Sequence, residues 1–291
     1  MLNNNLSKDK KIEIGGYNLP ADFKYLEKDF LLSLIDEEFS KKVSKVYFKL
    51  TGKSYNFNKI VEIFMIDDSI CTVDLASNKS ANYCDIIFDN EDFFTKVCSA
   101  ISILTACYLD LVESEMISLF EKVNFALPSN EGLFLLALFI AKKIGLPIDN
   151  ILVGGEFKTT PIIKGVYFAN LTERDVDDVL GAFFDEYDIA FDPISVKGIV
   201  AIDSYYDSYE DNNLCVNLNL SSPYLFARRV LNVVAFKREI DVKRAIDKLY
   251  NETSQEIPES ILNNEIPLYY LEYVILPFDF AISFINELYK V

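Results

Sequence analysis

The chain has 291 residues, of which 51% are hydrophobic and 25% charged, so it is long and apolar enough to bury one large core or two ordinary ones. It contains no histidine, which excludes Ser-His-Asp triads, Cys-His pairs and imidazole metal ligands and leaves any acid–base chemistry to Lys, Tyr, Cys or carboxylates. The formal net charge of −17 would repel a nucleic-acid backbone or an anionic membrane surface, so we expect neither partner.

The cysteines and the apolar runs indicate a cellular compartment. Five cysteines are spaced without a Cys-x-x-Cys pair, and MLNNNLSKDK lacks the basic-then-apolar pattern of a secretory signal. The longest apolar runs, such as LFLLALFIA, are about half the length that a membrane helix requires. We therefore expect a reduced, cytoplasmic protein without membrane spans.

The N-terminal part of the chain, residues 1–59, is expected to be a helical segment. After a polar start, apolar residues recur at helical spacing between positions 23 and 34 and again around Val46, and Gly52 is placed to end the second helix. Residues 60–92 alternate short apolar runs with polar turns, which is typical of short strands, and form a bridge to the rest of the chain.

Strands and helices alternate over residues 93–291. An amphipathic helix is predicted over 94–111, followed by the strand VNFALP, a helix over 132–144 that Gly145 ends, and the strand NILVGG. Farther on, the helix LTERDVDDVLGAFFDEY has Thr172 as its N-cap, and the buried strand LCVNLNL precedes the helix SPYLFARRVLNVV. This order predicts a doubly wound α/β domain with a mostly parallel sheet.

Four stretches resemble the threonine synthase family. GGYNLPADFKYLEKDFLLSLIDEEFSKKVSKVYFKLTG is similar to its N-terminal two-helix region, and FALPSNEGLFLLALFIAKKIGLPIDNILVGG to the stretch that grips the phosphate of pyridoxal phosphate (PLP). FDPISVKGIVAI and NLNLSSPYLFARRV resemble two later turns, in the same order. The resemblance implies the large domain of a PLP enzyme of fold type II, in which a lysine forms a Schiff base with the cofactor and phosphohomoserine is converted to threonine.

The phosphate loop departs from the family pattern. Where the family has Gly-Asn-Phe-Gly after a Ser or Thr, this chain has Asn130, Glu131, Gly132 and Leu133 after Ser129. The resemblance makes Ser129, Asn130 and Gly132 the remnant of a cofactor-binding loop. A phosphate nest needs unobstructed backbone N–H groups, and a carboxylate there repels phosphate. We expect this loop to have lost its phosphate.

Other family features are missing as well. The family's histidine in the Asp-Pro-His turn corresponds to Ile194, and the threonine expected near the pyridine nitrogen corresponds to Leu220. A small lobe of three βαβ-type units requires about 100 residues, whereas only residues 60–92 bridge that gap. Neither Lys79 nor Lys237 stands in the family's context for the Schiff-base lysine, and both are interpreted as surface charges.

These departures favour one hypothesis and leave two others open. The first is a shortened, catalytically inactive threonine-synthase-like protein with a binding or assembly role, for which we assign no catalytic residue, metal or cofactor. The alternative is an active PLP-dependent threonine synthase or related carbon–oxygen lyase that uses a non-standard lysine, with Ser129 and its neighbours still reaching the phosphate. A third is a small-molecule binding module with an apolar pocket near Ile194, Leu220 and Ser222.

Two aromatic stretches are candidates for contact with a partner. Tyr205, Tyr206 and Tyr209 lie among carboxylates, either as a recognition surface or at the edge of the core. The tail IPLYYLEYVILPFDFAISFINELYKV either packs back over the α/β domain or forms a subunit contact. We expect a homo-oligomer or a protein partner.

Overall fold

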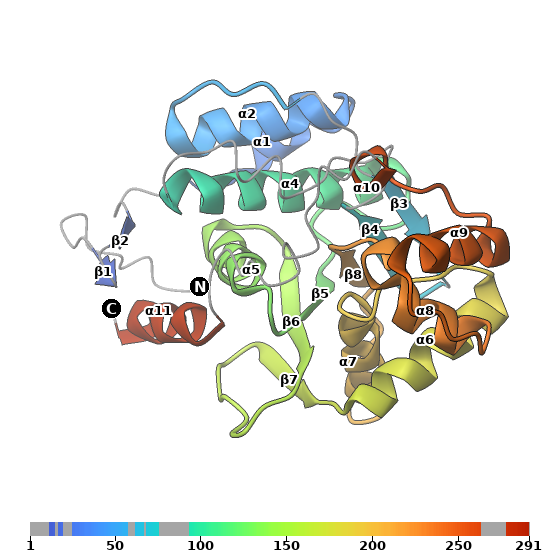
Figure 1. Cartoon of the computed structure of the whole chain (residues 1–291). Helices are drawn as coiled ribbons and strands as arrows, with labels where there is room; N and C mark the ends of the chain where they lie inside the picture. Colours follow the sequence, from blue (N-terminus) through green and yellow to red (C-terminus); the bar gives the residue numbers. More distant parts are fainter. Residues whose placement is uncertain are drawn as a thin grey trace.

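A mixed, mostly parallel sheet forms the centre of the molecule (Figure 1). The computed structural model describes residues 12–14, 17–19, 25–57, 62–66, 68–75, 93–262 and 278–290. Within these residues the sheet has six strands, in the order β3 (Glu62–Met65), β4 (Ile70–Asp74), β8 (Cys215–Asn219), β5 (Val123–Pro128), β6 (Ile148–Gly155) and β7 (Val166–Asn170). Only the edge pair β3–β4 is antiparallel, which confirms the predicted α/β class.

Helices cover both faces of this sheet because successive strand residues point to opposite sides. On β5, Phe125 and Leu127 belong to one hydrophobic cluster, whereas Ala126 belongs to the other. The first cluster takes in α1 (Lys28–Leu32), α2 (Phe39–Thr51), α4 (Phe93–Glu113), α5 (Gly132–Ile144) and α11 (Phe278–Lys290). The second takes in α6 (Glu173–Tyr187), α7 (Val196–Tyr206), α8 (Ala227–Val234) and α9 (Val242–Thr253). Three short elements complete the described chain: the hairpin β1 (Ile12–Ile14) and β2 (Tyr17–Leu19), the 3₁₀ turn η1 (Pro223–Phe226) and α10 (Glu259–Leu262).

Helix α4 differs from the amphipathic helix expected at this position, since it is buried on nearly every side. Figure 1 shows it between α2 and α5, so both of its long faces meet other helices. Its polar residues remain compatible with burial because Ser99, Ser102 and Thr105 each donate a hydroxyl hydrogen bond to a carbonyl one turn earlier. In the described part of the chain α4 is the one helix long and apolar enough to cross a membrane, and 83% of its apolar window is buried in the core, which is consistent with a soluble protein.

The predicted helix boundaries are confirmed by their caps. Gly52 ends α2 in the left-handed region at φ 70°, and Gly145 ends α5 at φ 120°, conformations that a side chain would strain. Thr172 and Asp175 form a reciprocal capping box at the start of α6. The Ser222 hydroxyl accepts from the backbone N–H of Tyr224, although the first turn after it is 3₁₀ and α8 begins later. The sequence interpretation had missed β7 and α9.

The bridge between the N-terminal helices and α4 contributes to the main sheet. Strands β3 and β4 form a hairpin, and β4 then pairs in parallel with β8. This confirms the strands expected there, while residues 76–92 lie outside the described residues. Helix α2 and α4 share one hydrophobic cluster. The domain boundaries placed at residues 59 and 92 therefore stay a prediction, and one hydrophobic core contains helices from both sides of them.

Candidate functional site

The carboxyl ends of the parallel strands bring the candidate residues to one edge of the sheet. The pairing of β4 with β8 places Asp74 beside Asn219, and the pairing of β5 with β6 places Pro128 beside Gly154. In open α/β sheets this edge is where ligands bind, because loops and helix N-termini converge on it. The predicted loop that starts at Ser129 leaves the sheet at this edge.

Ser129 is held tightly against the next strand. Its backbone N–H donates to the carbonyl of Gly154 at 2.8 Å. A Cβ built on Gly155 would lie 2.0 Å from Ser129 Oγ, so the serine side chain already fills the space above that glycine. Gly155 is therefore required by close packing with Ser129, a role in shaping the loop and not in itself a cofactor contact.

Glu131 occupies the N-cap position of α5, with φ −100° and ψ 60° and no side-chain capping hydrogen bond. Gly132 is buried and does not use a left-handed backbone, and Asn130 Oδ1 is buried without a hydrogen-bond partner. A carboxylate about 4 Å from a phosphate costs on the order of 1 to 4 kcal/mol, depending on the local dielectric. The carboxylate of Glu131 and the absence of a left-handed backbone at Gly132 therefore do not fit the phosphate of PLP.

The residues expected beside the cofactor ring are apolar and packed. Leu220 is almost fully buried in the core, and its backbone N–H donates to Ser195 Oγ at 2.9 Å. Ile194 is half-buried and donates its backbone N–H to Asp192 Oδ1 at 2.8 Å. Neither side chain offers a hydrogen bond to a pyridine nitrogen. This second position likewise does not fit the cofactor.

Asp192 is a functional candidate that the sequence interpretation did not single out. Its side chain is fully buried, with Oδ1 accepting from the backbone N–H groups of Ile194 and Ser195 and Oδ2 left without a hydrogen-bond partner. Burial raises the pKa of this carboxyl to about 6, although the hydrogen bonds from Ser195 and Ile194 act in the opposite direction. The Asp-Pro pair in FDPIS was visible in the sequence, but the burial of the aspartate was not.

A small cavity of about 70 Å³ lies beside the ends of β4 and β8. Its wall includes Asp74 and Asn219 from the two strand ends, Ser222 from the following turn, and Gln255 and Glu256 after α9. Of the residues predicted to line an apolar pocket, Ser222 lines this one, whereas Ile194 and Leu220 are not among its lining residues. The rest of the wall is largely apolar and includes Phe64, Phe191 and Pro258.

Of the two lysines that were considered for a Schiff base, the structure describes one. Lys237 pairs with Glu252 between α8 and α9 and is half-exposed, and Lys79 lies outside the described residues. Lys197 contacts Gly154 through its backbone carbonyl, but its amine lies 3.7 Å from a carboxylate oxygen of Glu173. No described contact joins a lysine amine to Ser129 Oγ.

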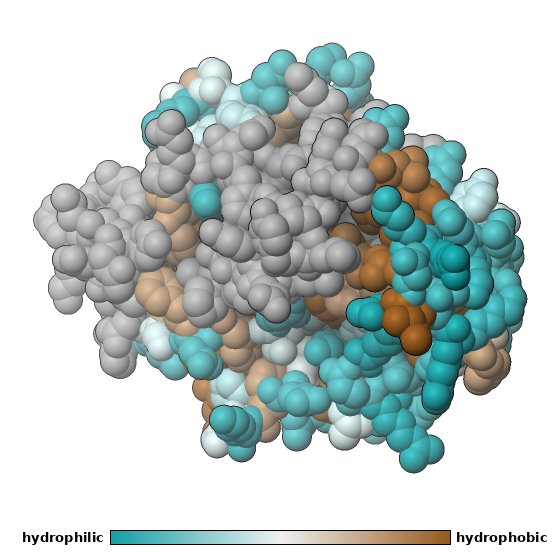
Figure 2. Space-filling model, viewed as in Figure 1, coloured by the Kyte–Doolittle hydropathy of each residue, from teal (hydrophilic) through white to brown (hydrophobic). Residues whose placement is uncertain are grey.

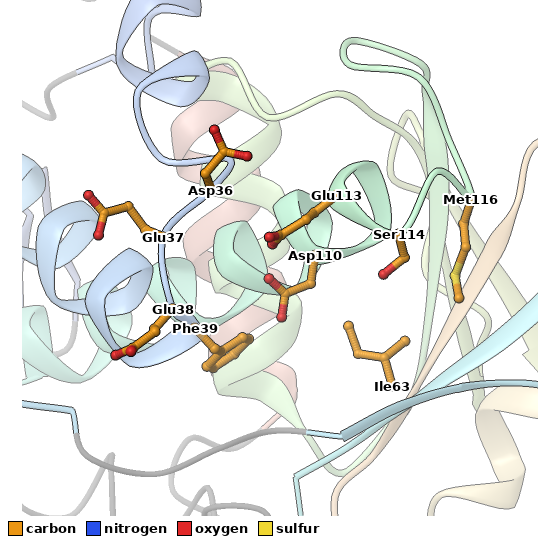
Figure 3. Close-up of a pocket in the computed structure, with 9 residues that line it drawn as sticks. All are labelled: Asp36, Glu37, Glu38, Phe39, Ile63, Asp110, Glu113, Ser114 and Met116. Atoms are coloured by element: carbon orange, nitrogen blue, oxygen red, sulfur yellow. The ribbon is translucent and has the colours of Figure 1, made fainter.

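A larger pocket, of about 430 Å³, lies between the start of α2, the end of α4 and β3. Figure 3 shows Asp110 and Glu113 on one side of it, and Asp36, Glu37 and Glu38 on the other. The fully buried amine of Lys42 bridges Asp110 and Glu113, so part of this negative charge is already neutralised. Among the described residues no group of three acidic or cysteine side chains could hold a metal ion.

Apolar side chains also gather on the surface over α8, α9 and α10, as the brown residues among teal ones in Figure 2 show. The exposed fraction is 91% for Phe236 and 88% for Ile240, both in the loop between α8 and α9. The tyrosines at the end of α7 behave differently: Tyr205 is buried and stacks on the exposed Tyr209, and its hydroxyl donates to Asp211 at 2.9 Å. Tyr205 thus belongs to the edge of the core.

Comparison with known proteins places the fold. No family model and no curated protein matches the sequence. Among solved structures, the chain resembles threonine synthase from Escherichia coli with a TM-score of 0.58 and 9% identity, over 85% of this chain and 93% of that chain. It also resembles PLP-bound threonine synthase from Brucella melitensis with a TM-score of 0.56 and 8% identity, over 82% of this chain and 94% of that chain. The chain therefore has the fold of the threonine synthases.

Proposed function

We propose that this protein is a PLP-independent binding protein built on the threonine synthase fold, without lyase or synthase activity. The observation that carries the proposal is the position of Glu131 at the N-cap of α5, where the family's loop would hold the cofactor phosphate. An anion is favoured at a helix N-terminus, but the negative charge of Glu131 at this position repels a second one.

Two further observations support the loss of PLP chemistry. The Leu220 side chain fills core space at the position where the resemblance places a polar contact to the ring. Lys197 and Lys237 each have a carboxylate partner, Glu173 and Glu252 respectively. A cofactor bound at this edge would lack a phosphate nest and a polar contact to its ring.

The test is a titration of the purified full chain with PLP, read as absorbance of an internal aldimine, followed by borohydride reduction and peptide mapping. We expect no saturable signal, and label scattered over surface lysines at high PLP only. Stoichiometric trapping on a single lysine would overturn the proposal, identify that lysine and establish the alternative of an active enzyme.

A matched pair of variants separates the effect of the carboxylate from general damage to the loop. Glu131→Gln keeps the size of the side chain and removes its charge, so inorganic phosphate should bind about tenfold more tightly than to the unmodified chain. Glu156→Gln, an exposed position just after β6, should leave phosphate binding unchanged. Equal phosphate affinity in both variants would show that the charge of Glu131 does not weaken phosphate binding at the helix N-terminus.

We propose further that the protein acts in the cytoplasm, as a homo-oligomer or with a protein partner. The cysteines Cys71, Cys98, Cys107 and Cys215 are buried free thiols, and burial raises the pKa of Cys71 to about 12, which suits a chain that does not form disulfides. Light scattering coupled to size-exclusion chromatography tests the oligomeric state. A monomeric mass at all concentrations would exclude the homo-oligomer and leave a different protein as the partner.

A further inference from the structure

A groove of about 700 Å³ runs along η1, α8 and the loop that joins α8 to α9. It belongs to the surface on which apolar side chains gather in Figure 2. Its apolar wall includes Leu225, Phe226, Ile240 and Val242. Ile240 is highly exposed, and so is Phe236 in the same loop. Exposed apolar side chains beside a groove favour contact with an apolar group of another molecule.

Phe236 combines an exposed side chain with an unfavourable backbone. It follows Ala235, the C-cap of α8, and has φ 53°, in the left-handed region that glycine usually occupies at the end of a helix. For a bulky residue this conformation costs about 1 to 2 kcal/mol. An exposed ring contributes little to the core that could offset this cost. The strain and the exposure together indicate a role for Phe236 outside the fold.

The groove also carries positive charge that the described chain does not neutralise. Arg228 and Arg238 line it and are exposed, and no ion pair within the described residues joins either of them to a carboxylate. Arg229 and Glu239 line it too, but both are engaged in ion pairs. Residues 228–248 contain seven Lys or Arg and three Asp or Glu, in a chain of net charge −17. This basic groove therefore suits a partner that is both acidic and partly apolar.

The end of α7 carries a surface of the opposite kind. Tyr209 is 54% exposed, and it lies between two exposed carboxylates, Asp207 and Glu210. We call these three residues the acidic turn. The Tyr209 ring stacks on Tyr205 with centroids 5.0 Å apart and meets Tyr167 edge-on at 5.8 Å. A tyrosine that is already held loses little entropy on binding, which favours it as an anchor at an interface.

The acidic turn and the basic groove are separate surfaces of one copy. The turn comes before β8 in the chain and the groove residues come after it, and the residues that line the groove include none of the turn. Contact between them therefore requires a second copy. Although each copy is strongly acidic, at about 0.15 M salt charges farther apart than about 8 Å are largely screened, so close pairs of opposite charge decide the contact.

We propose that the acidic turn of one copy docks into the basic groove of a second copy. Tyr209 is the apolar anchor against the loop of Phe236 and Ile240, and the flanking carboxylates pair with Arg228 and Arg238. The contact joins two different surfaces, so copies form a ring or a chain, or make the contact twice in a reciprocal dimer. The inference rests on the homo-oligomer proposed above and names its contact.

The test uses two charge-reversed variants of the full chain, with mass measured by light scattering coupled to size-exclusion chromatography at about 0.15 M ionic strength. The groove variant is Arg228→Glu with Arg238→Glu, and the turn variant is Asp207→Lys with Glu210→Lys. We expect each variant alone to associate at least about tenfold more weakly than the unmodified chain, because like charges then face each other. An equimolar mixture should associate again, since each variant supplies the surface that complements the other.

The rescue by mixing requires two folded chains, so it separates loss of the contact from damage to the fold. The matched control is Lys53→Glu with Lys158→Glu, at exposed positions away from both surfaces, which changes the net charge as the groove variant does and should associate as the unmodified chain does. Phe236→Gly relieves the left-handed strain, so it should raise the Tm of the dilute protein while weakening association.

Three results would overturn the proposal. Association that persists in both variants would leave the homo-oligomer but assign it to another contact, and two weakened variants that are not rescued by mixing would do the same. A monomeric unmodified chain that sediments with anionic lipid vesicles, and fails to in the groove variant, would assign the groove to a membrane surface. None of these results changes the PLP titration, which tests the loss of the cofactor separately.

Discussion

A single carboxyl group, Asp192, links the candidate site to the stability of the fold. It anchors the turn before α7 through two backbone N–H groups, and burial raises its pKa to about 6 from an ordinary value of 3.8. Because the folded state holds the proton more tightly than the unfolded chain, this group stabilises the fold at low pH. That contribution, on the order of 3 kcal/mol, is lost as the pH rises from about 4 to about 6.

The variant Asp192→Asn tests this contribution to stability. The asparagine carbonyl can still accept from Ile194 and Ser195 but cannot ionise, so the free energy of unfolding should lose the part of its pH dependence that falls between pH 4 and 6. Urea unfolding at several pH values, subtracted from the same series for the unmodified chain, isolates the effect from the other carboxylates. Parallel pH profiles for the two proteins would mean that Asp192 does not titrate there.

Among the elements, α6 depends strongly on its cap. Only Val176 and Leu180 of this helix are buried, so packing holds it on a narrow face. Thr172 Oγ1 accepts from Asp175 N at 3.3 Å, and Asp175 Oδ2 accepts from Thr172 N at 2.7 Å. The hydrogen bonds from the backbone and side chain of Thr172 lower the pKa of Asp175. A helix with little buried surface gains proportionately more from a satisfied N-terminus.

Thr172→Ala should therefore cost about 1 kcal/mol in the free energy of unfolding, or about 2 °C in Tm for a chain of this size. Thr172→Ser keeps the hydroxyl acceptor and should lie within a few tenths of a kcal/mol of the unmodified chain. Calorimetry of both variants measures the difference. An equal loss in the two would assign the effect to the threonine methyl group and not to the capping box.

On the scale of the whole molecule, the C-terminal helix closes the core. Ala281, Phe284 and Ile285 of α11 are fully buried and pack against α5, and the Phe284 ring lies 6.3 Å from that of Phe93 at the start of α4. The described part of the aromatic tail thus packs back over the domain, which is one of the two arrangements expected from the sequence. It joins residues that are nearly 200 positions apart in the chain.

Phe284→Ala should destabilise the protein by about 3 to 5 kcal/mol, because it opens a cavity in a packed interior. Ser283→Ala is the neighbouring control: that side chain is exposed and, among the described residues, bonds to the carbonyl of Asp279 within its own helix, so a change below about 0.5 kcal/mol is expected. The midpoint of urea unfolding compares them. A small effect of Phe284→Ala would mean that α11 is not part of the cooperative core.

The sequence by itself determined most of the local elements. Caps such as Gly52, Gly145 and Thr172 act within a few residues of the chain, and the strand–helix alternation required a mostly parallel sheet, so both could be read from short patterns. The proposed loss of phosphate binding also rests on a residue read from the sequence, Glu131, because a carboxylate repels phosphate.

Only the tertiary structure decided how distant residues meet. Asp74 and Asn219 are 145 residues apart in the chain and share a hydrogen bond because β4 pairs with β8. The same holds for Lys42, whose amine reaches across to Asp110 and Glu113 although its sequence context is that of a surface lysine. Strand order and burial are set by the packing of the whole core, and no local periodicity carries that information.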